Sequence, residues 1–141
     1  MPYSPLLIKP MRDELTGAGF TELLSAEDVD RAMEEAKSGM TLVVFNFVDG
    51  CSAGIARPGI RQALEGGSKR PDRLLSVFAE QDLEATARMR SHFADIPPSQ
   101  PSIALFKDGE LVYFVPRHRI EGRNAQILAH DLTAVFDEYG Q

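Results

Sequence analysis

The most constraining feature of the sequence is a run of seven residues, 42–48, that is almost entirely apolar and rich in β-forming side chains. The run reads Leu-Val-Val-Phe-Asn-Phe-Val, is too short for a typical helix and does not alternate between apolar and polar residues. Such a run is typical of a central strand buried on both faces, in a sheet that helices cover. Asp49 and Gly50 follow at once and predict a turn.

Helical periodicity and turn residues predict the elements on either side of this strand. Ser25 is a good N-cap, and Asp108-Gly109 is a strong hairpin signal. Residues 1–10 contain three prolines and indicate an irregular lead-in, while Pro58 is expected to kink its helix or mark an irregular turn. Helices are predicted at about 10–17, 26–38, 52–65, 82–93 and 124–139, and further strands at 74–79, 103–106 and 111–115.

This order of elements predicts an α/β fold. The β-α-β unit implies a parallel pair of strands with a right-handed crossover, and the hairpin adds an antiparallel pair. The result is a mixed four-stranded sheet flanked by helices on both faces, which is the thioredoxin-like arrangement. The 141 residues show no repeat, low-complexity tract or linker, so residues 1–141 are expected to form a single domain.

Composition excludes several classes of function. The net charge of −6 argues against nucleic-acid or acidic-membrane partners, which favour a basic surface. One cysteine excludes an intrachain disulfide and a multi-cysteine zinc site. The apolar runs are far short of the ~20 residues that span a bilayer. The N-terminus lacks the features of a secretory signal, so a reducing, cytoplasmic location is expected.

The single thiol, Cys51, falls between the central strand and the helix predicted at 52–65. Unpaired N–H groups and the positive end of the helix dipole at such a junction lower the pKa of a thiol. The thiolate is the nucleophile in thiol–disulfide exchange. A lone cysteine is also commonly a small buried hydrophobe. The polar or small neighbours Asp49, Gly50 and Ser52 favour an exposed turn instead.

Charged residues near the thiol allow more than one interpretation. The Asp49 carboxylate would oppose ionisation of Cys51, or it caps the helix or closes the turn. Arg57 and Arg61 either offset this charge and hold a carboxylate-bearing ligand, or lie on a solvated helix face.

Two later segments are further candidates. Pro101 precedes a strand; a cis bond there would bring its backbone near the end of the central strand and offer an edge to an extended peptide, although base rates favour trans. Arg117-His118-Arg119 either binds an anion or forms a solvated turn. The three histidines have no metal-ligand spacing, so no metal site is predicted.

From residue 46 to 58 the sequence resembles the bacilliredoxin family, thioredoxin-like proteins of bacteria. Here it reads Asn-Phe-Val-Asp-Gly-Cys-Ser-Ala-Gly-Ile-Ala-Arg-Pro, where the family carries Cys-Gly-Cys followed by Ala-Ala-Gly-x-Ala-Arg-Pro. The resemblance continues at 11–15, 101–109, 116–122 and 132–139, and so covers nearly the whole chain.

The resemblance implies redox chemistry without a bound cofactor. Members of the family remove bacillithiol from mixed disulfides on other proteins, and some show disulfide isomerase activity. The implied partners are therefore S-thiolated or disulfide-containing proteins, with a low-molecular-weight thiol as co-substrate. Pro101 matches the cis-proline of thioredoxin-like folds and would line the substrate groove beside Cys51. Gly50, Arg57, Arg117 and His118 are the other candidate substrate-binding residues.

The sequence departs from the family at the first motif cysteine. Asp49 occupies that position and Cys51 matches the second, resolving cysteine. A carboxylate cannot attack a disulfide, so the dithiol couple is lost and a monothiol cycle through Cys51 remains. The alternatives are a catalytically silent thioredoxin-like binding module and a thiol sensor in which modification of Cys51 is the signal.

Overall fold

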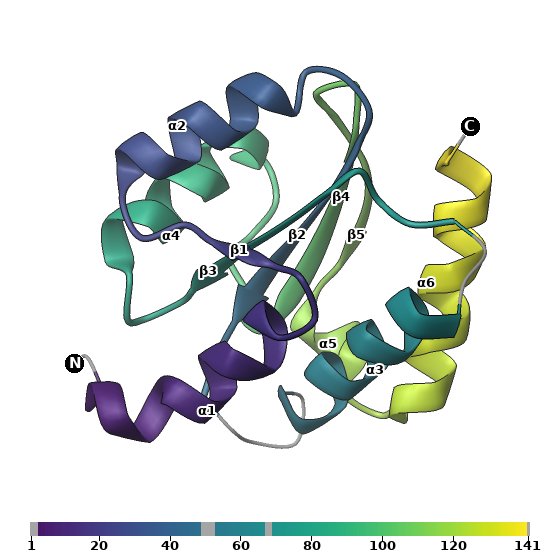
Figure 1. Ribbon diagram of the computed structural model, residues 1–141, viewed down its shortest axis with the longest axis horizontal. Coiled ribbons are helices and arrows are strands. Elements are labelled where there is room, and N and C mark those ends of the chain that lie inside the picture. The colour runs from purple at the N-terminus through teal and green to yellow at the C-terminus, as the bar shows by residue number, and fades with distance from the viewer. Residues whose placement is uncertain (1–2, 49–52, 67–68, 141) are drawn as a thin grey trace.

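A computed structural model describes residues 3–48, 53–66 and 69–140. In these residues five strands form one mixed sheet with the order β1-β3-β2-β4-β5 (Figure 1). The elements in chain order are α1 (Pro5–Thr16), β1 (Thr21–Glu22), α2 (Ala26–Glu35), β2 (Met40–Asn46), α3 (Ala53–Gly66), β3 (Arg73–Phe78), α4 (Leu83–Arg90), the 3-10 turn η1 (Ser91–Phe93), β4 (Ser102–Lys107), β5 (Glu110–Val115), α5 (Arg117–Ile120) and α6 (Ala125–Tyr139).

β2 is the central strand, as the apolar run predicts, and all seven of its residues are buried. It runs parallel to β3 and antiparallel to β4, with Phe45 opposite Val77 on one side and Ser102 on the other. The carboxyl ends of β2 and β3 therefore lie at the same end of the sheet as the amino end of β4. Residues that follow β2 and β3 and residues that precede β4 meet at this end.

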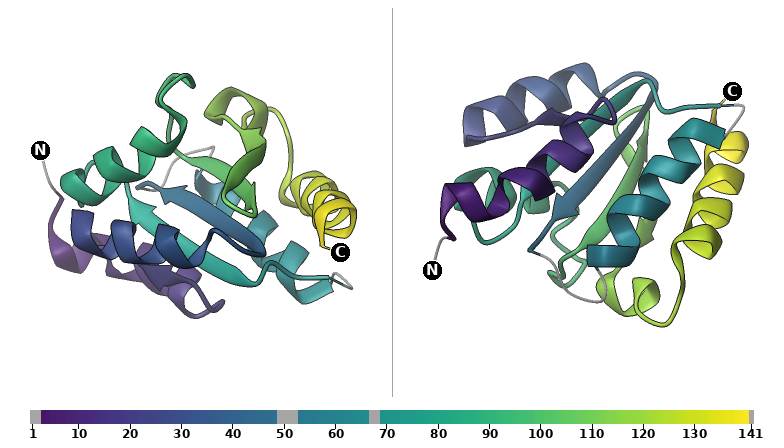
Figure 2. Two further views of the ribbon diagram at one scale, coloured as in Figure 1. Left: turned by 90° about the horizontal axis from the view of Figure 1, so that it is seen from above. Right: turned by 60° about the horizontal axis from the view of Figure 1, so that its bottom comes forward.

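Helices cover both faces of the sheet, which confirms the predicted fold class. Leu42 and Val44 of β2 face a core that α3 and α6 close, whereas Val43 and Phe45 face a second core closed by α2 and α4. Figure 2 shows α3 and α6 side by side on one face, with α2 and α4 on the other. This alternation explains the lack of polar positions in the run, because both sets of side chains are covered.

Two predictions about the sheet and the amino-terminal segment were wrong. The sheet has a fifth strand among the described residues: β1 pairs with β3 over only Thr21 and Glu22, too short for a period-two pattern. Residues 5–10 do not belong to an irregular lead-in, because α1 begins at Pro5. Proline is tolerated at the first helical position, where its missing N–H has no helical acceptor. Burial of Ile8, Met11 and Leu15 at helical spacing stabilises the helix.

The remaining elements follow the predictions with small shifts. α3 continues as one helix through Pro58, so no irregular turn interrupts it. Asp108 and Gly109 both have positive φ at the hairpin, as a two-residue turn of this kind requires. The short helix α5 was not predicted; it is held by the buried side chain of Ile120. None of the described helices has the length and apolar character that crossing a membrane would require.

Close packing of α3 on α6 generates a prediction at Gly59. A Cβ atom there would lie 2.9 Å from Leu128 Cδ2 and 3.1 Å from the Ala125 carbonyl oxygen. We expect Gly59→Ala to force the helices apart and to lower the free energy of unfolding by about 1–3 kcal/mol, measured by urea denaturation. Gly54→Ala is the matched control, since nothing lies within 4 Å of its added Cβ. Equal effects of the two substitutions would contradict the close approach.

Candidate functional site

The candidate site lies at the end of the sheet where β2 terminates. Asp49, Gly50 and Cys51 lie outside the described residues, so their predicted roles stay predictions. The described chain on either side ends β2 at Asn46 and begins α3 at Ala53. We call the described residues Asn46, Phe47, Ser99, Gln100, Pro101 and Arg117 the β2 edge, and the site is built from them.

Pro101 contributes a buried cis-proline to the β2 edge. The Gln100–Pro101 peptide bond is cis, which confirms the expectation drawn from the family resemblance and overturns the base-rate preference for trans. Ser102, the next residue, pairs with Phe45, so Pro101 lies beside the carboxyl end of β2. The Ser102 hydroxyl donates a hydrogen bond to the Ser99 carbonyl oxygen at 2.8 Å, which closes the turn before β4.

Arg117 and His118 begin α5, which is separated from β5 by Pro116 alone, and both are exposed. The Arg117 backbone N–H donates to the Ser99 hydroxyl at 3.3 Å, which places this basic segment against the turn before Pro101. The Arg117 guanidinium lies 3.7 Å from Glu121, with 52% of its side chain exposed. An ion pair this exposed is weak, so the guanidinium can exchange Glu121 for another anion.

Arg57 does not lie on a solvated helix face, and that alternative was wrong for this residue. It is 3% exposed, and its guanidinium donates to Glu14 Oε1 at 2.9 Å and to the Phe47 carbonyl oxygen at 2.7 Å. Burial of a cation requires such partners, and Glu14 supplies the opposite charge. The Arg61 side chain is 41% exposed, and its guanidinium lies 3.1 Å from the other oxygen of Glu14.

Asn46 completes this network beneath the site. Its side-chain oxygen accepts hydrogen bonds from Arg57 at 3.0 Å and from the Phe47 N–H at 2.9 Å, and its amide group donates to the Met11 carbonyl oxygen at 3.1 Å. The network joins α1, β2 and α3 where the chain leaves the sheet. Sequence reasoning missed Glu14 and Asn46, since Glu14 is 43 residues from Arg57 and no local pattern links them.

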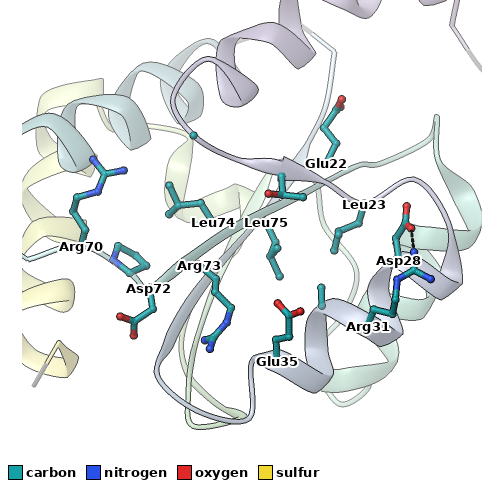
Figure 3. A pocket seen from close by; sticks show the side chains of 14 residues that line it. Glu22, Leu23, Asp28, Arg31, Glu35, Arg70, Asp72, Arg73, Leu74 and Leu75 are labelled. Carbon is teal, nitrogen blue, oxygen red and sulfur yellow. Dashed lines mark hydrogen bonds and ion pairs between the residues drawn. The ribbon is translucent and has the colours of Figure 1, made fainter.

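A hollow of about 700 Å³ lies elsewhere, between β1, α2 and the first half of β3 (Figure 3). Charged side chains of both signs surround a floor formed by Leu23, Leu74 and Leu75. Several of these charges are already satisfied within the protein: Arg31 lies 2.6 Å from Asp28, and Arg73 donates to the Ser38 carbonyl oxygen. None of the described residues predicted to bind substrate lines this hollow.

Solved structures share the arrangement of strands and helices. A structure titled a putative oxidoreductase with a thioredoxin fold matches with a TM-score of 0.60 at 17% identity, over 82% of this chain and 95% of that one. A mutant thioredoxin of Halobacterium salinarum matches with a TM-score of 0.58 at 16% identity, over 88% of this chain and 93% of that one. These similarities show the thioredoxin fold.

Sequence comparison gives the family. A family model described as Disulphide isomerase matches residues 3–140. A bacilliredoxin of Salinibacter ruber is 50% identical over 139 residues, which are 99% of this chain and 82% of the relative. A bacilliredoxin of Bacillus licheniformis is 49% identical over 137 residues, which are 97% of this chain and 94% of the relative. Together with the thioredoxin fold, these matches show that the chain belongs to the bacilliredoxin family.

Proposed function

We propose that this protein is a monothiol thiol–disulfide oxidoreductase that acts through Cys51. The observation that carries the proposal is that the only thiol of a bacilliredoxin chain stands between the carboxyl end of β2 and the start of α3. α3 has fourteen residues, so its amino end carries a developed positive dipole. A thiol preceding such a helix ionises readily, and its thiolate attacks disulfides. The cytoplasm keeps such a thiol reduced.

The substrate is a mixed disulfide between a protein and a low-molecular-weight thiol of the bacillithiol class. The Cys51 thiolate attacks the sulfur of the small thiol, forming a new disulfide to it and releasing the protein thiolate, which takes a proton from solvent. The thiolate of a second small-thiol molecule then attacks the small-thiol sulfur on Cys51. This regenerates the Cys51 thiolate and releases the oxidised small-thiol dimer, so the second small thiol is the reductant.

The described residues in and next to the β2 edge have separate roles in this cycle. The segment before β4, with Pro101, offers backbone to the extended substrate chain. Arg117 and His118 are exposed beside that segment and would attract the anionic groups of a small thiol. Arg57 is a positioning residue, because its guanidinium holds the carbonyl oxygen of Phe47, four residues before Cys51 in the sequence.

The second candidate is a binding module without turnover, favoured by Asp49 at the position of the attacking cysteine. In that case the β2 edge would hold a peptide or a small thiol, and Cys51 would be inert. The third candidate, a thiol sensor, shares a reactive Cys51 with the oxidoreductase. The two differ in whether the modified thiol is regenerated with turnover.

Reactivity of Cys51 separates the oxidoreductase from the silent module. We expect alkylation by iodoacetamide, followed across pH, to give a pKa below the free-cysteine value of about 8.5. Cys51→Ser should abolish both alkylation and release of the small thiol from a bacillithiolated model protein. An unreactive thiol in the folded wild type would refute the proposal, and a reactive thiol without turnover would leave the sensor.

Restoring the family motif is the converse test. We expect Asp49→Cys to give a disulfide reductase activity well above that of the wild type, because a second thiol supplies the missing dithiol couple. The matched control is Asp49→Ser, which removes the carboxylate without adding a thiol and should lower the pKa of Cys51 without adding that activity. A folded Asp49→Cys protein with wild-type activity would count against the placement of the site.

The exposed positive charge of Arg117 generates a further prediction. Arg117→Gln should raise KM for an anionic small thiol about threefold at low ionic strength, and added salt should shrink the difference because the guanidinium is exposed. Arg31→Gln is the control, since Arg31 lies on α2 and 68% of its side chain is exposed. A salt-independent change, or an equal change in the control, would exclude a direct charge contact.

A further inference from the structure

Another arginine reaches the β2 edge, from the helical layer opposite to that of Arg57. Arg90 is the last residue of α4, and its guanidinium carbon lies 5.3 Å from the centre of the Phe45 ring. Phe45 is fully buried and precedes Asn46, the residue that Arg57 contacts on the other face. The last two residues of β2 are thus each contacted by a guanidinium, one from α4 and one from α3.

Arg90 also holds the residue that precedes the cis-proline. Its Nη2 donates to Gln100 Oε1 at 2.6 Å, and the Gln100 amide group donates onward to Glu80 Oε1 at 3.4 Å. Glu80 follows β3 and Gln100 precedes β4, while β2 lies between those strands. A series of three hydrogen-bonded side chains therefore spans the end of β2. We call these side chains, Glu80, Gln100 and Arg90, the Gln100 bridge.

The electrostatics of the Gln100 bridge favour a fixed arrangement. Burial lowers the pKa of Arg90, and the nearby Glu80 carboxylate partly offsets this by raising it. A half-buried cation gains from a short hydrogen bond and from the face of an aromatic ring. Gln100 and Phe45 supply these two contacts, so moving Gln100 away would cost Arg90 a partner.

The backbone at Glu80 supplies an independent observation. Its φ is +69°, in the left-handed region that favours glycine. Among the described residues, Asp108 is the only other non-glycine residue with a positive φ. Glycine would suit the backbone better at this position. Glu80 retains a side chain there, and that side chain contacts Gln100.

We propose that Arg90 and Glu80 are positioning residues that hold the Gln100–Pro101 segment in the form that receives the substrate chain. The proposal rests on the proposed function and extends it to a determinant of substrate affinity. A preformed segment spares the substrate the cost of ordering it on binding. Losing the bridge should therefore raise KM for the protein substrate while leaving kcat and Cys51 alkylation unchanged.

Arg90→Met is the primary variant, since it keeps an apolar stem over Phe45 and removes the donor to Gln100. We expect KM for a bacillithiolated model protein to rise about tenfold, as for loss of a charged hydrogen bond, and hydrogen exchange in residues 96–103 to become faster. Arg90→Lys keeps the charge and should restore part of the affinity.

Glu80→Gly is the second variant and separates positioning from general stability. It relieves the positive φ, so the protein should be no less stable, yet KM should rise by about threefold because Gln100 loses an acceptor. Asp108→Gly is the matched control, because it also replaces a residue of positive φ by glycine but lies just after β4, at the opposite end of that strand from Pro101. It should leave KM and hydrogen exchange in residues 96–103 unchanged.

Unchanged exchange in residues 96–103 of a folded Arg90→Met protein would overturn the proposal, as would faster exchange with an unchanged KM. Failure of the proposed function has a different signature, which is absence of turnover in the wild type. In that case the exchange measurement still decides whether Arg90 and Glu80 hold the segment.

Discussion

Two-sided burial of β2 is the constraint on which the rest of the structure depends. None of its seven residues is more than 4% exposed. A strand buried in this way needs a partner strand along each edge and a helical layer over each face, because its backbone and side chains have no access to water. β3 and β4 satisfy the first need, and the α3–α6 and α2–α4 layers satisfy the second. The proposed chemistry therefore lies beyond the end of the strand, where the chain leaves the sheet.

The strand that carries this constraint is also what the sequence predicts best. The apolar run required a covered sheet, and the spacing of helices around it left few alternatives to a thioredoxin-like topology. The sequence predicted the hairpin at Asp108-Gly109 equally well, because both residues adopt the positive φ that such a turn requires. These signals are local, since each needs only a few neighbouring residues to be recognised.

What the sequence could not predict depends on contacts between distant residues. β1 is two residues long and exists as a strand because β3 lies beside it. The sequence left a solvated face open for Arg57, because its counter-charge, Glu14, lies on another helix. Gln100 gave no signal of its own, since its partners Arg90 and Glu80 come from α4 and the turn after β3. The cis bond at Pro101 was accessible only through the resemblance to a family.

Two guanidinium groups at one strand end call for a reason other than stability. A buried ion pair is weak evidence for stability, because well-packed apolar side chains of similar volume often stabilise a fold as well or better. Arg57 nevertheless fixes the Phe47 carbonyl oxygen, and Arg90 fixes the Gln100 side chain. One group secures the backbone that leads towards Cys51, and the other secures the segment that would receive a substrate. Through these two contacts the arginines restrain both sides of the β2 edge, which is the arrangement that the proposed thiol exchange through Cys51 would need.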